Sequence, residues 1–251
     1  MRAPVMMVHG MCCTGEVWAQ FRTFFEARGA RVYTPTLRPL LRVRRDPPAA
    51  LRELGFADYV SDLEAETARI EAETGSKPVV IGHSMGGLLA QALAERNRVL
   101  AAVLISPAAP ADCRTPSARV LWAVVGLGSK LGLTPKVIMP NRANVERAAL
   151  NVVPASERAA AFAGMVHESG RAFVEHGRFT VDESKIRVPI LTVAATKDRL
   201  VPAALVRLTG KKYERVGGEL REYADHAHWL YGEPGWEKPA AEIYDWLSAR
   251  V

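Results

Sequence analysis

A serine lies between two glycines in the stretch Gly82-His83-Ser84-Met85-Gly86, which matches the pattern G-x-S-x-G. Residues 78–81 before it have strand character, and a helix-forming run follows over residues 88–96. A serine held on a sharp turn from strand to helix has strained backbone angles, so the residues two positions away must be small. The turn projects the hydroxyl beyond the sheet and points the first N–H groups of the helix at any negative charge that forms there. The pattern therefore predicts that Ser84 is a nucleophile.

A serine hydroxyl is a poor nucleophile at neutral pH and needs a base, which a carboxylate usually orients. Asp198 follows the next-to-last predicted strand, and His226 and His228 both follow the last one. In a parallel sheet these loops open on the same edge as the serine. The chain order Ser, Asp, His is the order expected for triads on this type of sheet.

The elements that must position these residues alternate between short apolar runs and amphipathic runs. This alternation indicates an α/β fold, with a mostly parallel central sheet and helices on both faces. Strands are predicted over residues 3–9, 31–37, 78–81, 100–106, 188–195 and 219–223. Helices are predicted from Thr14 to Gly29, from an N-cap at Asp58 to Gly75, over 85–96, from 202 to about 210, and over 237–250.

The alternation breaks between residues 108 and 185. Helical patterns occur there around residues 118–131, 142–151 and 156–176, without a strong strand. We therefore predict a core of residues 1–107 and 186–251, with residues 108–185 inserted as a helical lid. Because this insertion leaves and re-enters at the carboxyl edge of the sheet, it should lie over Ser84.

At this point the sequence resembles the α/β-hydrolase fold superfamily, and within it the lid-bearing serine esterases and lipases. The resemblance covers most of the core and is carried by four motifs, namely His9-Gly10, Gly82-His83-Ser84-Met85-Gly86-Gly87, Lys197-Asp198-Arg199-Leu200-Val201-Pro202 and Ala227-His228-Trp229. It implies that Ser84 is the nucleophile, that a histidine is the base and that Asp198 orients it. Two relatives of the same fold, the haloalkane dehalogenases and epoxide hydrolases, carry an aspartate where this chain has Ser84.

The resemblance also implies an oxyanion hole, made by the backbone N–H groups of Met11 and Met85. His228 is favoured as the base because it lies between a small residue and an aromatic one, as the catalytic histidine of similar enzymes does, and His226 is the alternative base. Asp182 and Asp225 are weaker alternatives to Asp198. His9 and His83 are expected to pack or form hydrogen bonds within their loops. Residues expected to line a substrate pocket are Cys12, Trp122, Met139, Met165 and Trp229.

Composition narrows the remaining possibilities. No run reaches the roughly 18 apolar residues that a membrane span needs, and no histidine or cysteine cluster has metal-ligand spacing. The formal net charge is +6, but its densest basic group (Arg38, Arg42, Arg44 and Arg45) has no interleaved aromatics and is a poor nucleic-acid footprint. A solvated loop is favoured there over an electrostatic lip for anionic substrates. The three cysteines favour a reduced, cytoplasmic setting.

The predicted function is cofactor-free hydrolysis of a carboxylic ester, or a related acyl bond, of a medium-sized and mostly apolar small molecule. Other chemistry on the same triad remains open: thioester, lactone or carbon–carbon bond hydrolysis, or cofactor-free peroxidation. A ligand-binding protein with negligible turnover is the alternative from a different class. The oligomeric state and the physiological substrate do not follow from the sequence.

Overall fold

Six parallel strands form the central sheet in the described part of the chain, which is residues 2–113 and 137–251 of this computed structural model. The strand order is β2-β1-β3-β4-β7-β8, so that β3 lies inside the sheet between β1 and β4. The strands of this sheet are β1 (Val5–Val8), β2 (Val32–Tyr33), β3 (Val79–His83), β4 (Ala102–Ile105), β7 (Ile190–Ala195) and β8 (Glu219–Tyr223). This arrangement confirms the predicted α/β class and the parallel sheet.

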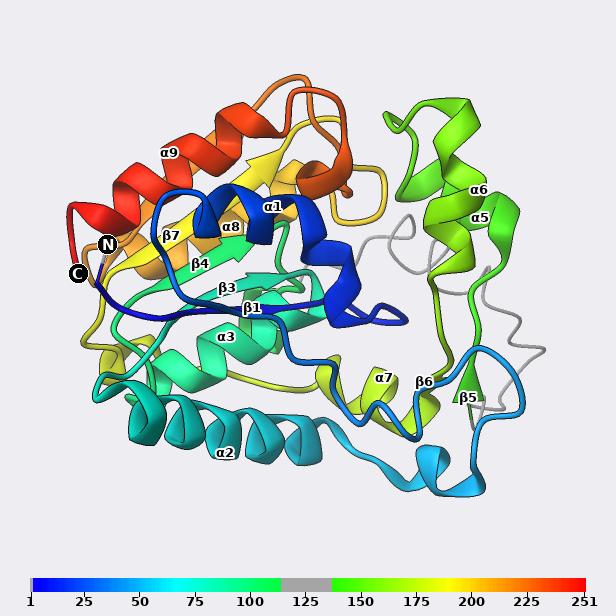
Figure 1. The fold of residues 1–251 in the computed structure, drawn as a ribbon, viewed down its shortest axis with the longest axis horizontal. Helices are drawn as coiled ribbons and strands as arrows, with labels where there is room; N and C mark the ends of the chain where they lie inside the picture. The colour runs from blue at the N-terminus through cyan, green and yellow to red at the C-terminus, as the bar shows by residue number, and fades with distance from the viewer. Residues whose placement is uncertain (1, 114–136) are drawn as a thin grey trace.

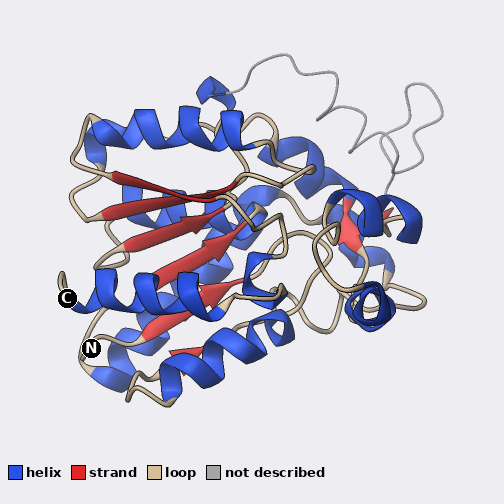
Figure 2. Cartoon of the chain, turned by 90° about the horizontal axis from the view of Figure 1, so that it is seen from above, coloured by secondary structure: helices blue, strands red, loops and turns tan. Residues whose placement is uncertain are grey.

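Helices cover both faces of the sheet (Figures 1 and 2). Alternate residues of each inner strand supply the two cores: Met7 packs with α1 and α9, whereas Met6 packs with α2 and α3. The covering helices are α1 (Ala19–Glu26), α2 (Phe56–Thr74), α3 (Met85–Glu95), α8 (Ala203–Glu214) and α9 (Glu237–Ser248). Strands buried on both faces explain why the sequence shows continuous apolar runs rather than alternating ones.

Several boundaries differ from the predicted ones for local reasons. Val17 lies in a short 3-10 turn, η1 (Gly15–Trp18), and α1 begins only after it. Asp58 is not the N-cap of α2, because the helix already begins at Phe56. Its carboxylate instead accepts a hydrogen bond from Gly55 N at 2.7 Å, which is the acidic half of a capping box. At the other end, Gly75 closes α2 with a φ of 76°, as expected for a left-handed helix cap.

Helices α5 and α6, between β4 and β7, lie beyond the carboxyl ends of the strands (Figure 1). The sequence shows no strong strand here, and the strands that are present are short: β5 and β6 form an antiparallel pair of two residues each. Its β6 divides the predicted helix over 156–176 into α6 and α7. The elements of this segment include η3 (Ala111–Cys113), β5 (Val137–Ile138), α5 (Arg142–Ala148), α6 (Ala155–Ala163), β6 (Glu168–Ser169), α7 (Gly170–His176) and η4 (Glu183–Lys185). The predicted helix over 118–131 lies outside the described residues.

The second half of this segment is tied to the core by hydrogen bonds from main chain and side chain. Val166 N donates to Cys12 O at 2.9 Å, and His167 N donates to Val43 O at 3.0 Å. Ser169 Oγ donates to Leu54 O at 2.5 Å. Residues 166–169 are therefore built into the body of the protein and meet the loop that follows β1.

Candidate active site

Ser84 sits at the turn between β3 and α3 with φ 54° and ψ −118°. This is a strained conformation for a residue with a side chain. A Cβ added at Gly82 would lie 2.2 Å from Gly86 O, and one added at Gly86 would lie 2.2 Å from Val8 O. Both distances are far below van der Waals contact, so the turn requires glycine at both positions, as the sequence predicts.

Asp198 and His228 are hydrogen-bonded to each other at the same edge of the sheet. The distance from His228 Nδ1 to Asp198 Oδ2 is 2.7 Å, and both residues are buried. The other oxygen of Asp198 accepts from Leu200 N and Val201 N, each at 2.8 Å. A carboxylate can only accept here, so the proton lies on Nδ1 of His228 and leaves Nε2 free to act as a base.

Two residues that the sequence analysis did not assign to the site, His83 and Glu233, form hydrogen bonds with the backbone at and around His228. The Nε2 of His83, the residue before Ser84, is bonded to His228 O at 2.8 Å, and the two rings lie 4.5 Å apart. The Glu233 carboxylate accepts hydrogen bonds from Ala227 N at 2.7 Å and from Trp229 N at 3.0 Å. It therefore binds the backbone amides of the residues on both sides of His228. Its only sequence signal is an acid five residues after the histidine in an otherwise apolar stretch.

The alternative residues lie elsewhere. His226 Nδ1 is 3.3 Å from Glu233 Oε2, and its ring packs edge-on against Tyr223. Asp225 is 90% exposed and pairs with Lys197. Asp182 accepts a hydrogen bond from Ser184 N in the turn before β7. The acid that His228 contacts is therefore Asp198.

The loop that follows β1 (residues 9–14, the β1 loop) passes directly against Ser84. A Cβ added at Gly10 would lie 3.1 Å from Ser84 Cβ and 3.0 Å from His83 Nδ1. Met11 is the next residue, and its backbone N–H makes no hydrogen bond to the described part of the chain. Met85 begins α3, so its N–H has no partner within the helix. Two backbone donors are thus available on the two segments that meet at Ser84.

His9 anchors the start of the β1 loop. Its Nε2 accepts from Leu37 N at 3.2 Å and from Arg42 at 3.1 Å, so the proton is on Nδ1, which donates to Gly10 O at 2.8 Å. Burial, reinforced by the charge of Arg42, lowers the pKa of His9 from 6.5 to about 3. Burial, together with the neighbouring His228, also lowers the pKa of His83 well below 6.5. Both histidines are internal hydrogen-bonding groups, but their partners extend beyond their own loops, to Leu37 and Arg42 for His9 and to His228 for His83.

These lowered pKa values predict a loss of stability on acidification. Between about pH 6.5 and pH 3 the unfolded chain binds a proton at His9 that the folded chain does not bind. The free energy of unfolding should therefore fall by about 1.4 kcal/mol per pH unit for this group. Urea unfolding of wild type and His9→Gln at pH 7, 6 and 5 measures the effect, because glutamine offers an acceptor without titrating. Equal pH slopes in the two proteins would contradict the lowered pKa.

The arginine-rich loop is not the solvated loop expected from its charge. Arg42 is only 2% exposed and forms an ion pair with Glu168, in which Nη2 lies 2.8 Å from Oε2. Arg44 donates to the backbone oxygens of Phe162 and Met165. Two of the four arginines in this loop, Arg42 and Arg44, therefore join the β2–α2 connection to α6 and the segment after it, and these contacts give the electrostatic lip no support.

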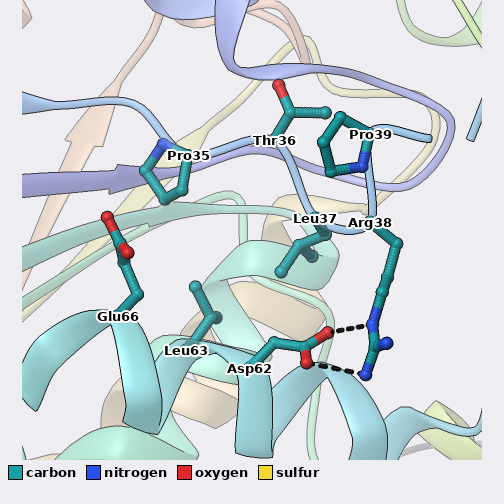
Figure 3. A pocket seen from close by; sticks show the side chains of 8 residues that line it. All are labelled: Pro35, Thr36, Leu37, Arg38, Pro39, Asp62, Leu63 and Glu66. Atoms are coloured by element: carbon teal, nitrogen blue, oxygen red, sulfur yellow. Dashed lines mark hydrogen bonds and ion pairs between the residues drawn. The ribbon is translucent and has the colours of Figure 1, made fainter. Parts of the chain in front are cut away.

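Arg38, the first arginine of this loop, lies on the rim of a surface depression of about 280 Å³ between the loop after β2 and α2. It makes two hydrogen bonds to Asp62, at 2.6 and 2.7 Å, as Figure 3 shows. The depression is lined by Pro35, Thr36, Leu37, Arg38, Pro39, Asp62, Leu63 and Glu66. None of these residues is Ser84, Asp198 or His228.

The residues proposed to line a substrate pocket have different surroundings. Met165 and Trp229 are buried in one apolar cluster, against which Met139 packs. Cys12 is buried in the β1 loop, and burial raises the pKa of its thiol well above its usual range. Trp122 lies outside the described residues. Three of the four described positions thus share one apolar cluster.

Within residues 2–113 and 137–251, no three His, Cys, Asp or Glu side chains come together in a way that could hold a metal ion. No helix in the same ranges has the length and apolar character needed to cross a membrane.

Known proteins with the same architecture come from several sources. A methylesterase from Arabidopsis has a TM-score of 0.76 at 14% identity, with 98% of this chain and 99% of that chain covered. A pyrethroid hydrolase from Sphingobium faniae has a TM-score of 0.74 at 18% identity, with 98% of each covered. A lipase-esterase related protein from Clostridium acetobutylicum has a TM-score of 0.71 at 13% identity, with 100% and 95% covered. The model of the alpha/beta hydrolase family matches residues 5–245, and the chain belongs to that family.

Proposed function

We propose that this protein is a serine hydrolase that cleaves a carboxylic ester through an acyl-serine intermediate. Ser84 is the nucleophile, His228 the general base and Asp198 the residue that orients His228. The observation that carries the proposal is the 2.7 Å bond from His228 Nδ1 to Asp198, because it leaves Nε2 as the basic nitrogen on the edge where Ser84 projects.

The reaction follows from these positions. His228 Nε2 takes the proton of Ser84 as the hydroxyl oxygen attacks the ester carbonyl. The N–H groups of Met11 and Met85 donate to the oxyanion that forms. The tetrahedral adduct then expels the alcohol, which receives the proton from His228. A water molecule, deprotonated by the same histidine, attacks the acyl-serine and releases the acid.

A medium-sized, mostly apolar substrate would suit the apolar side chains predicted to line the pocket. Met139, Met165 and Trp229 belong to or pack against one apolar cluster. The structural relatives named as a methylesterase and a pyrethroid hydrolase support ester cleavage as the reaction class. We also propose that residues 108–185 act as a lid on the core, in which residues 166–169 form the fixed part because they are bonded to the β1 loop and to Leu54.

The test is hydrolysis of p-nitrophenyl esters from acetate to decanoate by wild type, Ser84→Ala, His228→Ala and His226→Ala. Turnover should be lost in Ser84→Ala and His228→Ala and retained in His226→Ala, since His226 faces Glu233 rather than Asp198. The chain length with the highest kcat/KM then gives the size of the acyl pocket.

Two results would count against the proposal. Retained activity in Ser84→Ala would exclude the acyl-serine. Absence of turnover on every ester, with a folded wild type, would remove esterase activity and leave thioester or lactone panels and ligand binding as the next measurements.

A further inference from the structure

A buried ion pair contacts the backbone of the β1 loop at Cys12. Arg42 and Glu168 are 126 positions apart in the sequence, and both side chains have 0% exposure. Glu168 Oε1 accepts from Tyr59 Oη at 2.5 Å and from Ser169 N at 2.9 Å. Glu168 Oε2 accepts from Arg42 at 2.8 Å and from Cys12 N at 3.3 Å. Every oxygen of this carboxylate is therefore occupied, and one of its donors is the backbone of the β1 loop.

Stability alone does not account for such a pair. Removing two charges from water is costly, and a buried ion pair is often no more stabilising than apolar residues of similar volume. The pair also supplies a buried hydrogen-bond acceptor, Glu168 Oε2, for the backbone N–H of Cys12.

Cys12 has a φ of 59°. Residues other than glycine, asparagine and aspartate rarely adopt such a positive φ. Both of its backbone polar groups are held by the segment after α6: Cys12 N by Glu168, and Cys12 O by Val166 N at 2.9 Å. The unfavourable conformation is thus held both by these contacts and by a turn inside the loop, in which Cys13 N donates to Gly10 O at 3.3 Å. Cys12 shares a peptide bond with Met11, so the contact at Cys12 N fixes the plane of the Met11–Cys12 peptide. The Met11 N–H lies in the preceding peptide, whose oxygen, Gly10 O, accepts from Cys13 N across the same turn.

We propose that Glu168 is a positioning residue for the oxyanion hole, acting through Cys12 on the N–H of Met11. Arg42 balances its charge, so that a developing oxyanion does not face an uncompensated carboxylate. The proposal rests on the function proposed above, in which Met11 N–H is an oxyanion donor. It assigns to the inserted segment a part in the chemistry as well as in covering the site.

The test uses two variants that separate positioning from folding. The double variant Arg42→Met/Glu168→Leu removes both charges together and should fold, but it leaves Cys12 N without its acceptor. Glu168→Asp keeps the charge beside Arg42 and shortens the side chain by one methylene. The matched control is Ser169→Ala, which removes the equally buried hydrogen bond to Leu54 O next to Glu168. Among the hydrogen bonds of the described residues, none joins the Ser169 hydroxyl to Cys12.

For both test variants we expect kcat on the best ester to fall about 10- to 100-fold, somewhat less than the loss of a whole oxyanion donor. KM should change by less than about threefold. Inhibition by a trifluoromethyl ketone, whose adduct places an oxyanion in the hole, should weaken in parallel with kcat. Amide hydrogen exchange in peptides that cover residues 8–14 should accelerate in these variants, whereas Ser169→Ala should leave kcat, inhibition and exchange in this loop near wild type.

The outcomes separate the two proposals. Unchanged kcat in Glu168→Asp and in the double variant, or an equal loss in Ser169→Ala, would overturn the role of Glu168. If the double variant does not fold, Glu168→Asp alone decides. If wild type hydrolyses no ester, the proposed function fails, while unchanged exchange over residues 8–14 would still refute the positioning by Glu168 on its own.

Discussion

Replacing Asp198 by asparagine should lower kcat on the best ester by about 10⁴-fold, with little change in KM. The carboxylate accepts from His228 Nδ1 on one oxygen and from two backbone amides on the other. An asparagine whose oxygen keeps the two amides presents its NH₂ group to His228. The imidazole then carries its proton on Nε2, where the base is needed. Steady-state kinetics on a p-nitrophenyl ester measures the loss.

Asp225→Asn is the matched control for this substitution, because Asp225 lies in the histidine loop but is 90% exposed and pairs only with Lys197 among the described contacts. It should keep kcat within about twofold of wild type, as expected for an exposed ion pair. A loss in Asp225→Asn comparable to that in Asp198→Asn would show that the acid has been assigned to the wrong residue.

Replacing Arg42 by methionine should lower the free energy of unfolding by about 3–5 kcal/mol, because it leaves the Glu168 carboxylate buried without its counter-charge. Few single substitutions have effects this large. Urea unfolding monitored by the fluorescence of the five tryptophans is a suitable measurement.

The double variant Arg42→Met/Glu168→Leu completes the cycle and should recover at least half of the lost stability, since no buried charge remains. Arg45→Met, an exposed neighbour in the same loop, serves as the control and should change stability by less than about 0.5 kcal/mol. A loss in Arg42→Met no larger than in Arg45→Met would mean that Arg42 reaches water in solution.

The parts of the fold that are encoded locally could be predicted from the sequence. The apolar runs of β1, β4 and β7 are continuous because both faces are buried, and the glycines around Ser84 are required by contacts within the same turn. Gly75 ends α2 where its left-handed conformation indicates. The start of α2 was placed wrongly because an acidic residue is equally typical of the N-cap and of the third helical position.

The parts that depend on distant partners could not be predicted. Residues 156–176 have a helical pattern, yet β6 interrupts it because Val166 and Glu168 find acceptors and donors in the β1 loop and the arginine-rich loop. From the sequence alone Arg42 is interpreted as a surface charge, because its partner Glu168 lies 126 positions later in the chain. Ser84, Asp198 and His228 are recognisable from motifs, whereas Glu233 and Glu168 act on the backbone and leave no motif.

The pairing of Arg42 with Glu168 also bears on the order in which the chain can fold as it is synthesised. At about 5–20 residues per second, the ribosome needs roughly 6–25 s to add the 126 residues that separate them. β1 is already synthesised when Arg42 is added, and α2 and β3 follow during this interval. Throughout it, the Glu168 carboxylate that pairs with the Arg42 guanidinium in the folded protein is absent. The β1 loop and the arginine-rich loop must therefore stay open on the nascent chain until β6 emerges, and the β1 loop beside Ser84 is among the last parts of the N-terminal half to close.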